Sequence, residues 1–456
     1  MAIDCKFKGL IYNKDDLCKK FELDANMSCS DFIKKLYVGF QENIFSELDG
    51  SFSFILHDSN KKNDVAFRSI DGNYPLYIEK ENKGYKISDT LKDFKGKNIN
   101  YSALNDIVLT VFTQDYRTVL SGVNFIPENT LIKISGQNMS ERKFDVPLVS
   151  TNNPQDAFLN IITKHVEAIM KQTEPAILFS GGLDSTLLYL ITKKFYPIKA
   201  INIINSEDDF SSSKFAKENN VDIIRKKISF RDVLENIDEY VLSSESFDSH
   251  FLGQYLALKL VDNNYIFSGF GPEKLLSGYN GHNNPKKQSD KLKLKLKELE
   301  ENIGVLNERD RFVDLAKSYQ EDVDGFYNYV LNRPSIFPNN SLINKNLIAP
   351  FMSKKMFGLA FYLKESNSDL VYDKKIEELV ARKVNVPEYI INRDKSPGNR
   401  TLFKEAINEV DDYLKNDKLF VNSLNHPIYG YFMSTYDSFF KCYLFKKFVD
   451  AFQVNI

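Results

Sequence analysis

Beyond residue 150, short apolar segments alternate with segments of helical composition, and few architectures accommodate that order. The apolar segments read PAILFS (175–180), IKAINII (198–204) and VDIIRKKIS (221–229). Helical segments follow them, beginning at Ser185, Ser211 and Arg231. Apolar strands joined by helical crossovers indicate a parallel sheet that is covered on both faces. The sequence therefore predicts an α/β domain in this half of the chain.

From about Asn284 onward the chain is predicted to be mainly helical. The segment KKQSDKLKLKLKELEEN (286–302) changes from basic to acidic. Apolar residues recur in and just after it at helical spacing, namely Leu292, Leu296, Leu299 and Ile303. Such a pattern predicts a solvated helix with one apolar stripe, and a partner-binding helix is the alternative.

The first 145 or so residues have a different pattern, rich in short strands. SFSFILHD (51–58), DVAFRSI (64–70) and TLIKISG (130–136) are separated by Gly, Asn and Asp turns, which predicts a β-rich domain. Asp145–Asp156 collects Pro, Asn, Ser and Thr without apolar periodicity, as linkers do. We therefore expect two domains, residues 1–148 and residues 149–456.

Composition excludes some classes of function. Sixty Lys and Arg nearly balance 62 Asp and Glu, so no overall charge attracts the chain to nucleic acid or to an anionic membrane. The start MAIDCKFKGL lacks the features of a signal peptide, and no apolar run approaches the roughly 18 residues of a membrane-spanning helix. The four cysteines have neither metal-ligand nor redox spacing. We expect a cytoplasmic protein without a membrane span or a nucleic-acid partner.

The loop SGGLDS (180–185) joins the first apolar segment to its helix. Gly181 and Gly182 allow a ligand to approach the backbone, and the free N–H groups at the helix start favour an anion such as phosphate. The loop matches neither the Walker A pattern nor GxGxxG. Asp184 would repel phosphate unless a cation lay between them, which predicts Mg²⁺. The alternative is a tight turn with Asp184 or Ser185 as the helix N-cap.

SGGLDS after an apolar strand resembles the PP-loop of the ATP pyrophosphatases, and the chain resembles the asparagine synthetase group within them. Similar landmarks occur along most of the sequence. They are LDGSFSFILHD (48–58), Arg68 with GNYPLYI (72–78), IPENTLIKI (126–134), YIFSGFGPEKLLSGY (265–279), APFMSKK (349–355) and PEYIINRDK (387–395). The resemblance implies an N-terminal sandwich of the Ntn-glutaminase type and a C-terminal PP-loop synthetase domain, with ATP and Mg²⁺ as cofactors.

The resemblance also implies roles for individual residues. Asp184 and Glu273 would bind Mg²⁺, Lys395 would stabilise a tetrahedral oxyanion, and Arg393 would bind phosphate or orient that lysine. The nucleotide would contact Phe179, Ser180, Gly181, Gly182, Leu183, Asp184, Ser185, Ile204, Ser268, Gly269 and Gly271.

The sequence departs from this family at several positions. The family's glutaminase uses an N-terminal cysteine, whereas position 2 is Ala2 and the nitrogen of Cys5 lies within a peptide bond. We therefore predict that the first domain has no glutaminase activity. Asn346 and Ser353 stand where asparagine synthetases have carboxylates, which argues against aspartate and ammonia as substrates.

Relatives with a disabled glutaminase half include β-lactam synthetases and lasso peptide cyclases, and the chain resembles the latter more than the former. The likeness lies in SEDDFSSSKFAKE (206–218), in Asn346 and in DKSPGNRTLF (394–403). It implies adenylation of an Asp or Glu side chain with release of pyrophosphate, followed by attack of the peptide's own N-terminus to close a macrolactam. The partners would be a leader-processed precursor peptide and its leader peptidase.

Two other functions remain open from the sequence. One is a β-lactam synthetase-like or other small-molecule amide ligase, and the other is an inactive nucleotide-binding interaction protein. RNA modification fits poorly with the near-neutral charge and the unpaired cysteines.

Overall fold

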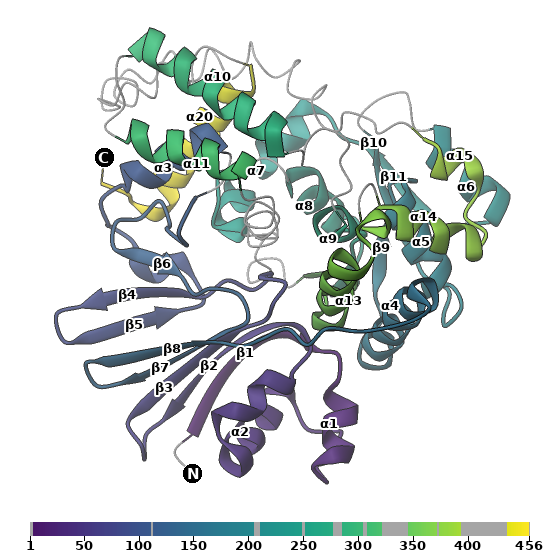
Figure 1. The fold of residues 1–456 in the computed structure, drawn as a ribbon, viewed down its shortest axis with the longest axis horizontal. Coiled ribbons are helices and arrows are strands. Elements are labelled where there is room, and N and C mark those ends of the chain that lie inside the picture. Colours follow the sequence, from purple (N-terminus) through teal and green to yellow (C-terminus); the bar gives the residue numbers. More distant parts are fainter. Residues whose placement is uncertain are drawn as a thin grey trace.

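The computed structural model describes residues 3–110, 113–204, 210–248, 251–276, 285–303, 308–321, 345–371, 374–393 and 436–455. Two sheet systems organise the molecule, an antiparallel one built from the first 143 residues and a parallel one built from later residues (Figure 1). The predicted fold class is confirmed.

The N-terminal half contains an antiparallel five-stranded sheet with the order β1-β2-β3-β7-β8 and a three-stranded sheet with the order β5-β4-β6. The strands are β1 (Ile3–Ile11), β2 (Gly50–Asp58), β3 (Asn63–Arg68), β4 (Tyr77–Glu81), β5 (Gly84–Ser88), β6 (Val123–Phe125), β7 (Thr130–Ser135) and β8 (Asn138–Lys143). The three strands predicted from SFSFILHD, DVAFRSI and TLIKISG are β2, β3 and β7.

Each face of the five-stranded sheet has its own apolar core, because side chains alternate between the faces of a strand. On one face Phe52, Phe54 and Phe67 pack with Phe32 and Leu36 of helix α2. On the other face Ala66, Ile132 and Ile134 pack with the three-stranded sheet through Ile78 and Ile87. Helices α1 (Lys14–Lys20) and α2 (Cys29–Phe40) and the short 3-10 segments η1 (Glu42–Glu47) and η2 (Leu91–Phe94) complete this half, with α3 (Tyr101–Thr110). The result is a sandwich covered on its outer face by helices (Figure 1).

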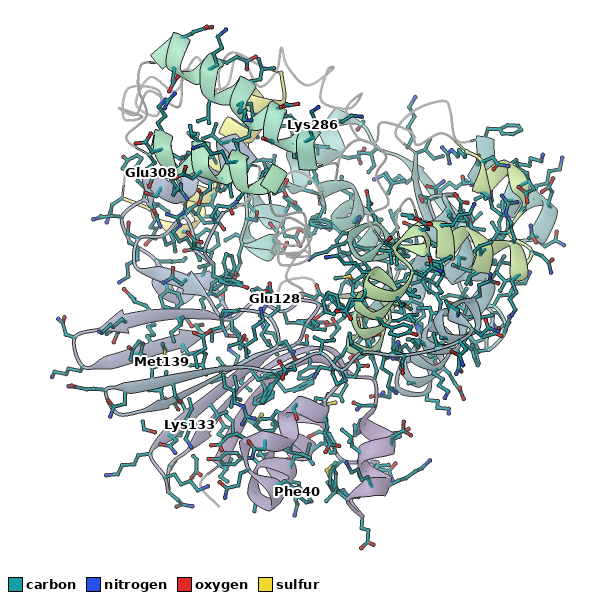
Figure 2. The ribbon with its side chains drawn as sticks, in the orientation of Figure 1. Phe40, Glu128, Lys133, Met139, Lys286 and Glu308 are labelled. Carbon is teal, nitrogen blue, oxygen red and sulfur yellow. The ribbon has the colours of Figure 1, made fainter. Side chains whose placement is uncertain are left out.

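Large apolar side chains also reach the surface of this half. Phe40 at the end of α2 and Met139 on β8 are exposed and lie at its outer edges (Figure 2).

Glu128, in contrast, is buried near the middle of the molecule (Figure 2). Glu128 pairs there with the fully buried Arg68 at 3.4 Å. A buried charge needs such a partner.

The C-terminal half contains a parallel sheet with the order β11-β10-β9-β12-β13. Its strands are β9 (Ala176–Leu178), β10 (Ala200–Ile204), β11 (Ile223–Lys227), β12 (Tyr265–Phe267) and β13 (Asn346–Ile348). The successive residues Ala176 and Ile177 point to opposite faces and both are fully buried, so both faces of the sheet are covered. After β9, the chain first adds β10 and β11 on one side of that strand and later adds β12 and β13 on the other side. Ligands of such sheets bind beyond the carboxyl ends of the strands at this switch point.

Two groups of helices pack around this sheet (Figure 1). The first group comprises α4 (Pro154–Gln172), α5 (Leu183–Thr192), α13 (Lys354–Ser366) and α14 (Lys375–Lys383). The second comprises α7 (Phe230–Ser244), α8 (Leu252–Leu258) and α20 (Tyr436–Phe452). The remaining elements here are α6 (Phe210–Asn219), α9 (Pro272–Leu275), α15 (Glu388–Ile391) and the 3-10 segment η4 (Ser368–Leu370).

The helix predicted near residue 290 is α10 (Pro285–Ile303), which lies beside α11 (Arg309–Glu321) (Figure 1). Leu292 and Leu296 of its apolar stripe are buried, because α11 and α3 pack against the helix. Leu292 and Leu296 are 3% and 5% exposed, whereas Leu294 on another face is 57% exposed. No helix in the described part of the chain is long and apolar enough to cross a membrane.

The two halves are joined by buried polar contacts. Asp49 Oδ1 accepts a hydrogen bond from the Lys354 backbone N–H at 2.7 Å, at the start of α13. Asn73 Nδ2 donates to the Leu347 carbonyl at 2.7 Å, at the parallel sheet's edge strand. The halves therefore pack directly on one another.

Candidate active site

The loop after β9 has a backbone that requires glycine. Gly181 has a φ of +70°, and a Cβ there would lie 2.6 Å from the backbone nitrogen of Ser212 on α6. Because Gly181 has no side chain, the first turns of α5 and α6 can approach each other closely. This close packing places the loop at the switch point of the sheet.

Helix α5 begins at Leu183, two residues earlier than expected from the sequence, so Asp184 lies in its first turn. Its N-cap is Gly182, which makes no side-chain capping bond. Neither Asp184 nor Ser185 caps the helix, and the tight-turn alternative is wrong in that respect. The Ser180 and Ser185 hydroxyls instead lie 3.1 Å apart across the loop. The first-turn N–H groups of α5 have no acceptor within the helix and are therefore available to an anion at this loop.

A second glycine-bearing loop follows β12 and packs on the first. A Cβ on Gly269 would lie 2.9 Å from the Ser185 nitrogen, so the two loops are in van der Waals contact. Gly271 has a φ of +131° and leaves room for Phe351. Ser268 is buried, and its N–H donates to the Ile348 carbonyl at 2.8 Å. The structure thus brings together the predicted segments 180–185 and 268–271.

The other predicted nucleotide contacts have different surroundings. Ile204 ends β10 and is half-buried at the same edge of the sheet. The Phe179 side chain is 1% exposed and packs between the rings of Tyr189 and Phe215. Only the backbone of Phe179 can therefore face a ligand at this edge.

A lysine that the sequence reasoning missed lies at Asp184. The Lys374 ammonium is 2.6 Å from Asp184 Oδ1 and 3.6 Å from Glu377 Oε2. Burial alone would lower the pKa of Lys374, but the carboxylates of Glu377, Asp184 and Glu273 outweigh it and raise that pKa. Glu377 is fully buried, and its burial together with the charge of Asp184 raises its own pKa well above the ordinary range. The site thus places one cation beside Asp184, next to a buried Glu377 whose surroundings disfavour its ionisation.

The sequence offered only a weak signal for this pair. Lys374 and Glu377 belong to a run of charged residues that is typical of an exposed helix face. However, Ile376, Val380 and Ala381 are fully buried, which defines one face of α14. Glu377 shares that face, and a carboxylate on an apolar face could have been noticed.

The described part of the structure contains only one of the two predicted catalytic residues. Arg393 is half-buried after α15, and its N–H donates to the Ile390 carbonyl at 3.4 Å. Lys395 lies outside the described residues. Helix α15 is connected to α6 by the Tyr389 hydroxyl, which donates to Glu218 at 2.8 Å.

The donor set around Asp184 suits Mg²⁺ bound together with a phosphate. No group of three or more His, Cys, Asp or Glu side chains within the described ranges is arranged to hold a metal by itself. Mg²⁺ commonly uses one or two protein carboxylates and takes its other ligands from phosphate and water. Asp184 and Glu273, whose charges both act on Lys374, would be such carboxylates, and Gly181 and Gly182 have no side chain that would cover the backbone from phosphate.

The arrangement is that of an α/β domain that binds a nucleotide beyond the ends of its strands, joined to an antiparallel sandwich. Residues 158–419 match asparagine synthase, and residues 3–145 match a glutamine amidotransferase domain. The chain belongs to the asparagine synthase family, because that match covers more than half of its 456 residues. Members of this family are ATP-dependent carbon–nitrogen ligases, and the chain is an amide ligase of this kind. The resemblance noted from the sequence is confirmed.

Known proteins similar to the chain include asparagine synthetases and a microcin-processing protein. A putative asparagine synthetase of Methanocaldococcus jannaschii is 23% identical over 451 residues, which cover 89% of this chain and 82% of that protein. The human asparagine synthetase is 25% identical over 310 residues, 60% of this chain and 54% of the human one. The microcin J25-processing protein McjC of Escherichia coli is 25% identical over 232 residues, 46% of this chain and 44% of McjC. The chain thus spans about half the length of the last two.

Proposed function

We propose that this ligase closes a macrolactam within a peptide, joining an Asp or Glu side chain to the peptide's N-terminal amine. The observation that carries the proposal is the contact between the two glycine-bearing loops, which sets Asp184 and the start of α5 at the switch point. A carboxylate needs activation before an amine can displace its oxygen. Transfer of AMP from ATP to that carboxylate supplies a good leaving group and releases pyrophosphate.

Each part of the site has a task in this reaction. The backbone N–H groups of residues 180–185 would bind the phosphates, and the serine hydroxyls there would add further donors. Asp184 and Glu273 would hold Mg²⁺, which neutralises phosphate charge when it is bound. Ser268, Gly269, Gly271, Ile204 and the Phe179 backbone would line the nucleotide. Lys395 would stabilise the oxyanion formed by amine attack, with Arg393 orienting it or binding phosphate.

Several residues support an amine carried by the substrate instead of ammonia. Ala2 stands where a glutaminase needs its nucleophile, so we propose that the domain of residues 1–148 is a scaffold without glutaminase activity. Ser353 is the N-cap of α13 and accepts from the Met356 N–H at 3.2 Å. Asn346 Oδ1 accepts from the Tyr74 hydroxyl at 3.1 Å. Both side chains are engaged in structural contacts where asparagine synthetases have carboxylates.

The peptide substrate is supported by one relative. McjC is named as a microcin J25-processing protein, and it aligns with nearly half of the chain. We propose that a leader-processed precursor peptide is the substrate and that its leader peptidase is a partner. A cytoplasmic location remains a prediction from the sequence.

A peptide cyclisation assay with ATP and Mg²⁺ tests the proposal. Wild type should convert a peptide with a free N-terminus and an internal Asp or Glu into a product lighter by one water, with stoichiometric AMP and pyrophosphate. Asp184→Ala and Lys395→Ala should each lower the rate by roughly 100-fold or more, since loss of one transition-state stabiliser costs about 2.7–4 kcal/mol. Lys171→Ala, on the exposed face of α4, is the matched control.

Three outcomes separate the competing functions. Unchanged cyclisation by Asp184→Ala contradicts the proposed mechanism. Pyrophosphate release with free amino-acid-like carboxylates but not with peptides favours a small-molecule amide ligase. ATP binding without pyrophosphate exchange on any carboxylate favours an inactive nucleotide-binding protein.

A further inference from the structure

The ammonium of Lys374 lies 2.6 Å from Asp184 and 3.6 Å from Glu377, and the charge of Glu273 also acts on it. Asp184 belongs to the first turn of α5, Glu273 to α9 and Glu377 to the first turn of α14. The Lys374 side chain is only 13% exposed, and its partner Glu377 is fully buried. An ion pair this well buried is not a solvated surface contact, so its position is defined by the surrounding structure.

The backbone of Lys374 is also fixed. Its φ is +58°, a left-handed conformation that is uncommon for residues with a side chain. Its N–H donates to the Leu276 carbonyl at 3.4 Å, which connects it to the residue after the helix that carries Glu273. The lysine is therefore hydrogen-bonded to the end of the helix that follows the second glycine-bearing loop, and its side chain reaches Asp184 beside the first loop. The Lys374 ammonium therefore contacts Asp184, the carboxylate that the proposed function assigns as a ligand of Mg²⁺.

We propose that Lys374 is a resident cation of the phosphate site, which neutralises Asp184 in the ligand-free enzyme and binds the phosphates of ATP or pyrophosphate once Mg²⁺ takes Asp184. Mg²⁺ and the ammonium would compete for the single negative charge of Asp184, so metal binding would weaken the contact between Lys374 and this carboxylate. Glu377, 3.6 Å from the ammonium, is the positioning residue that keeps it at the site. The proposal rests on the proposed function, because that function makes Asp184 a metal ligand.

Binding measurements on the ligand-free enzyme test this exchange without relying on catalysis. The probes are Mn²⁺ alone, followed by electron paramagnetic resonance, and inorganic pyrophosphate alone, followed by calorimetry. In Lys374→Met, Mn²⁺ affinity should rise about tenfold, because the metal no longer competes with an ammonium for the charge of Asp184. Pyrophosphate affinity should fall about tenfold, because a cation is lost from the anion site. Lys374→Arg, which keeps the charge, should restore pyrophosphate binding.

The matched control is Lys375→Met, one residue along, whose side chain is 55% exposed and pairs with Glu378 on the same helix. It should leave both affinities within twofold of wild type. Lys374→Gln replaces the methionine variant if the latter does not fold.

The outcomes distinguish this proposal from the function on which it rests. If Asp184→Asn does not weaken Mn²⁺ binding, the assigned metal role of Asp184 fails, and with it the proposed function. If Asp184→Asn weakens Mn²⁺ binding while the Lys374 variant leaves either Mn²⁺ or pyrophosphate affinity unchanged, the cation exchange is overturned and the proposed function stands.

Discussion

Asp71 is a carboxylate that is almost fully shielded from solvent. It is buried and accepts hydrogen bonds from the hydroxyls of Ser51 and Ser69. Burial raises its pKa from 3.8 to about 6, although both serines and the nearby Arg68 act in the opposite direction. The two hydroxyls stabilise the charge only partly, so ionisation of Asp71 opposes folding.

The consequence is a defined pH dependence at this residue. The pKa of Asp71 is raised on folding. The free energy of unfolding is therefore not reduced by this residue below about pH 4, where it is protonated in both states, and is fully reduced above about pH 6, where it is ionised in both states. Asp71→Asn should therefore gain up to roughly 3 kcal/mol of unfolding free energy relative to wild type between pH 4 and pH 7. Thermal melting at several pH values measures this gain. The exposed Asp310→Asn is the control, and a gain that does not change with pH contradicts the prediction.

Elements differ in how far the sequence alone predicted them. The strands β2, β3, β7, β9 and β10 and the loop at Gly181 follow from short-range patterns, since apolar runs and turn residues act locally. The pair of Lys374 with Asp184 does not, because 190 residues separate the partners and a charged helix face has many possible uses. The burial of the α10 leucines depended on partners outside the helix, the neighbouring α11 and the distant α3.

Helix α10 gives a test at the scale of one element. Leu292→Ala should destabilise the packing of α10 by roughly 2–5 kcal/mol, because it leaves a cavity against α11 and α3. Leu294→Ala, two residues away and 57% exposed, should change stability by less than about 0.5 kcal/mol. Limited proteolysis and hydrogen exchange of residues 285–303 report the difference. Equal protection in both variants would show that the leucine stripe does not anchor this helix.

At the scale of the whole molecule, Asp49 connects the sandwich to the synthetase half. It accepts the backbone N–H of Lys354 and lies 3.5 Å from His165 Nε2. Its own burial opposes ionisation, but the contacts with His165 and Lys354 outweigh it and lower the pKa of Asp49. Burial lowers the pKa of Lys354 to about 8. The carboxylate of Asp49, in the N-terminal half, is therefore stabilised by residues of the C-terminal half.

Removing this charge should uncouple the halves. Asp49→Ala leaves the Lys354 ammonium buried without its counter-charge, a change that typically costs about 3–5 kcal/mol. Differential scanning calorimetry should show a lower first transition and a separation of the two halves into distinct transitions. Asp64→Ala, in an exposed pair with His57, is the control. One unshifted transition in Asp49→Ala would show that apolar packing alone holds the halves together.

The contact between Gly181 and Ser212 restricts how this scaffold can be redesigned. A side chain at position 181 would collide with the backbone of α6, a clash that no rotamer change at Ser212 relieves. Directed evolution toward other acids and amines should therefore keep both positions constant and diversify residues elsewhere. Libraries that randomise the whole turn would consist mostly of inactive clones.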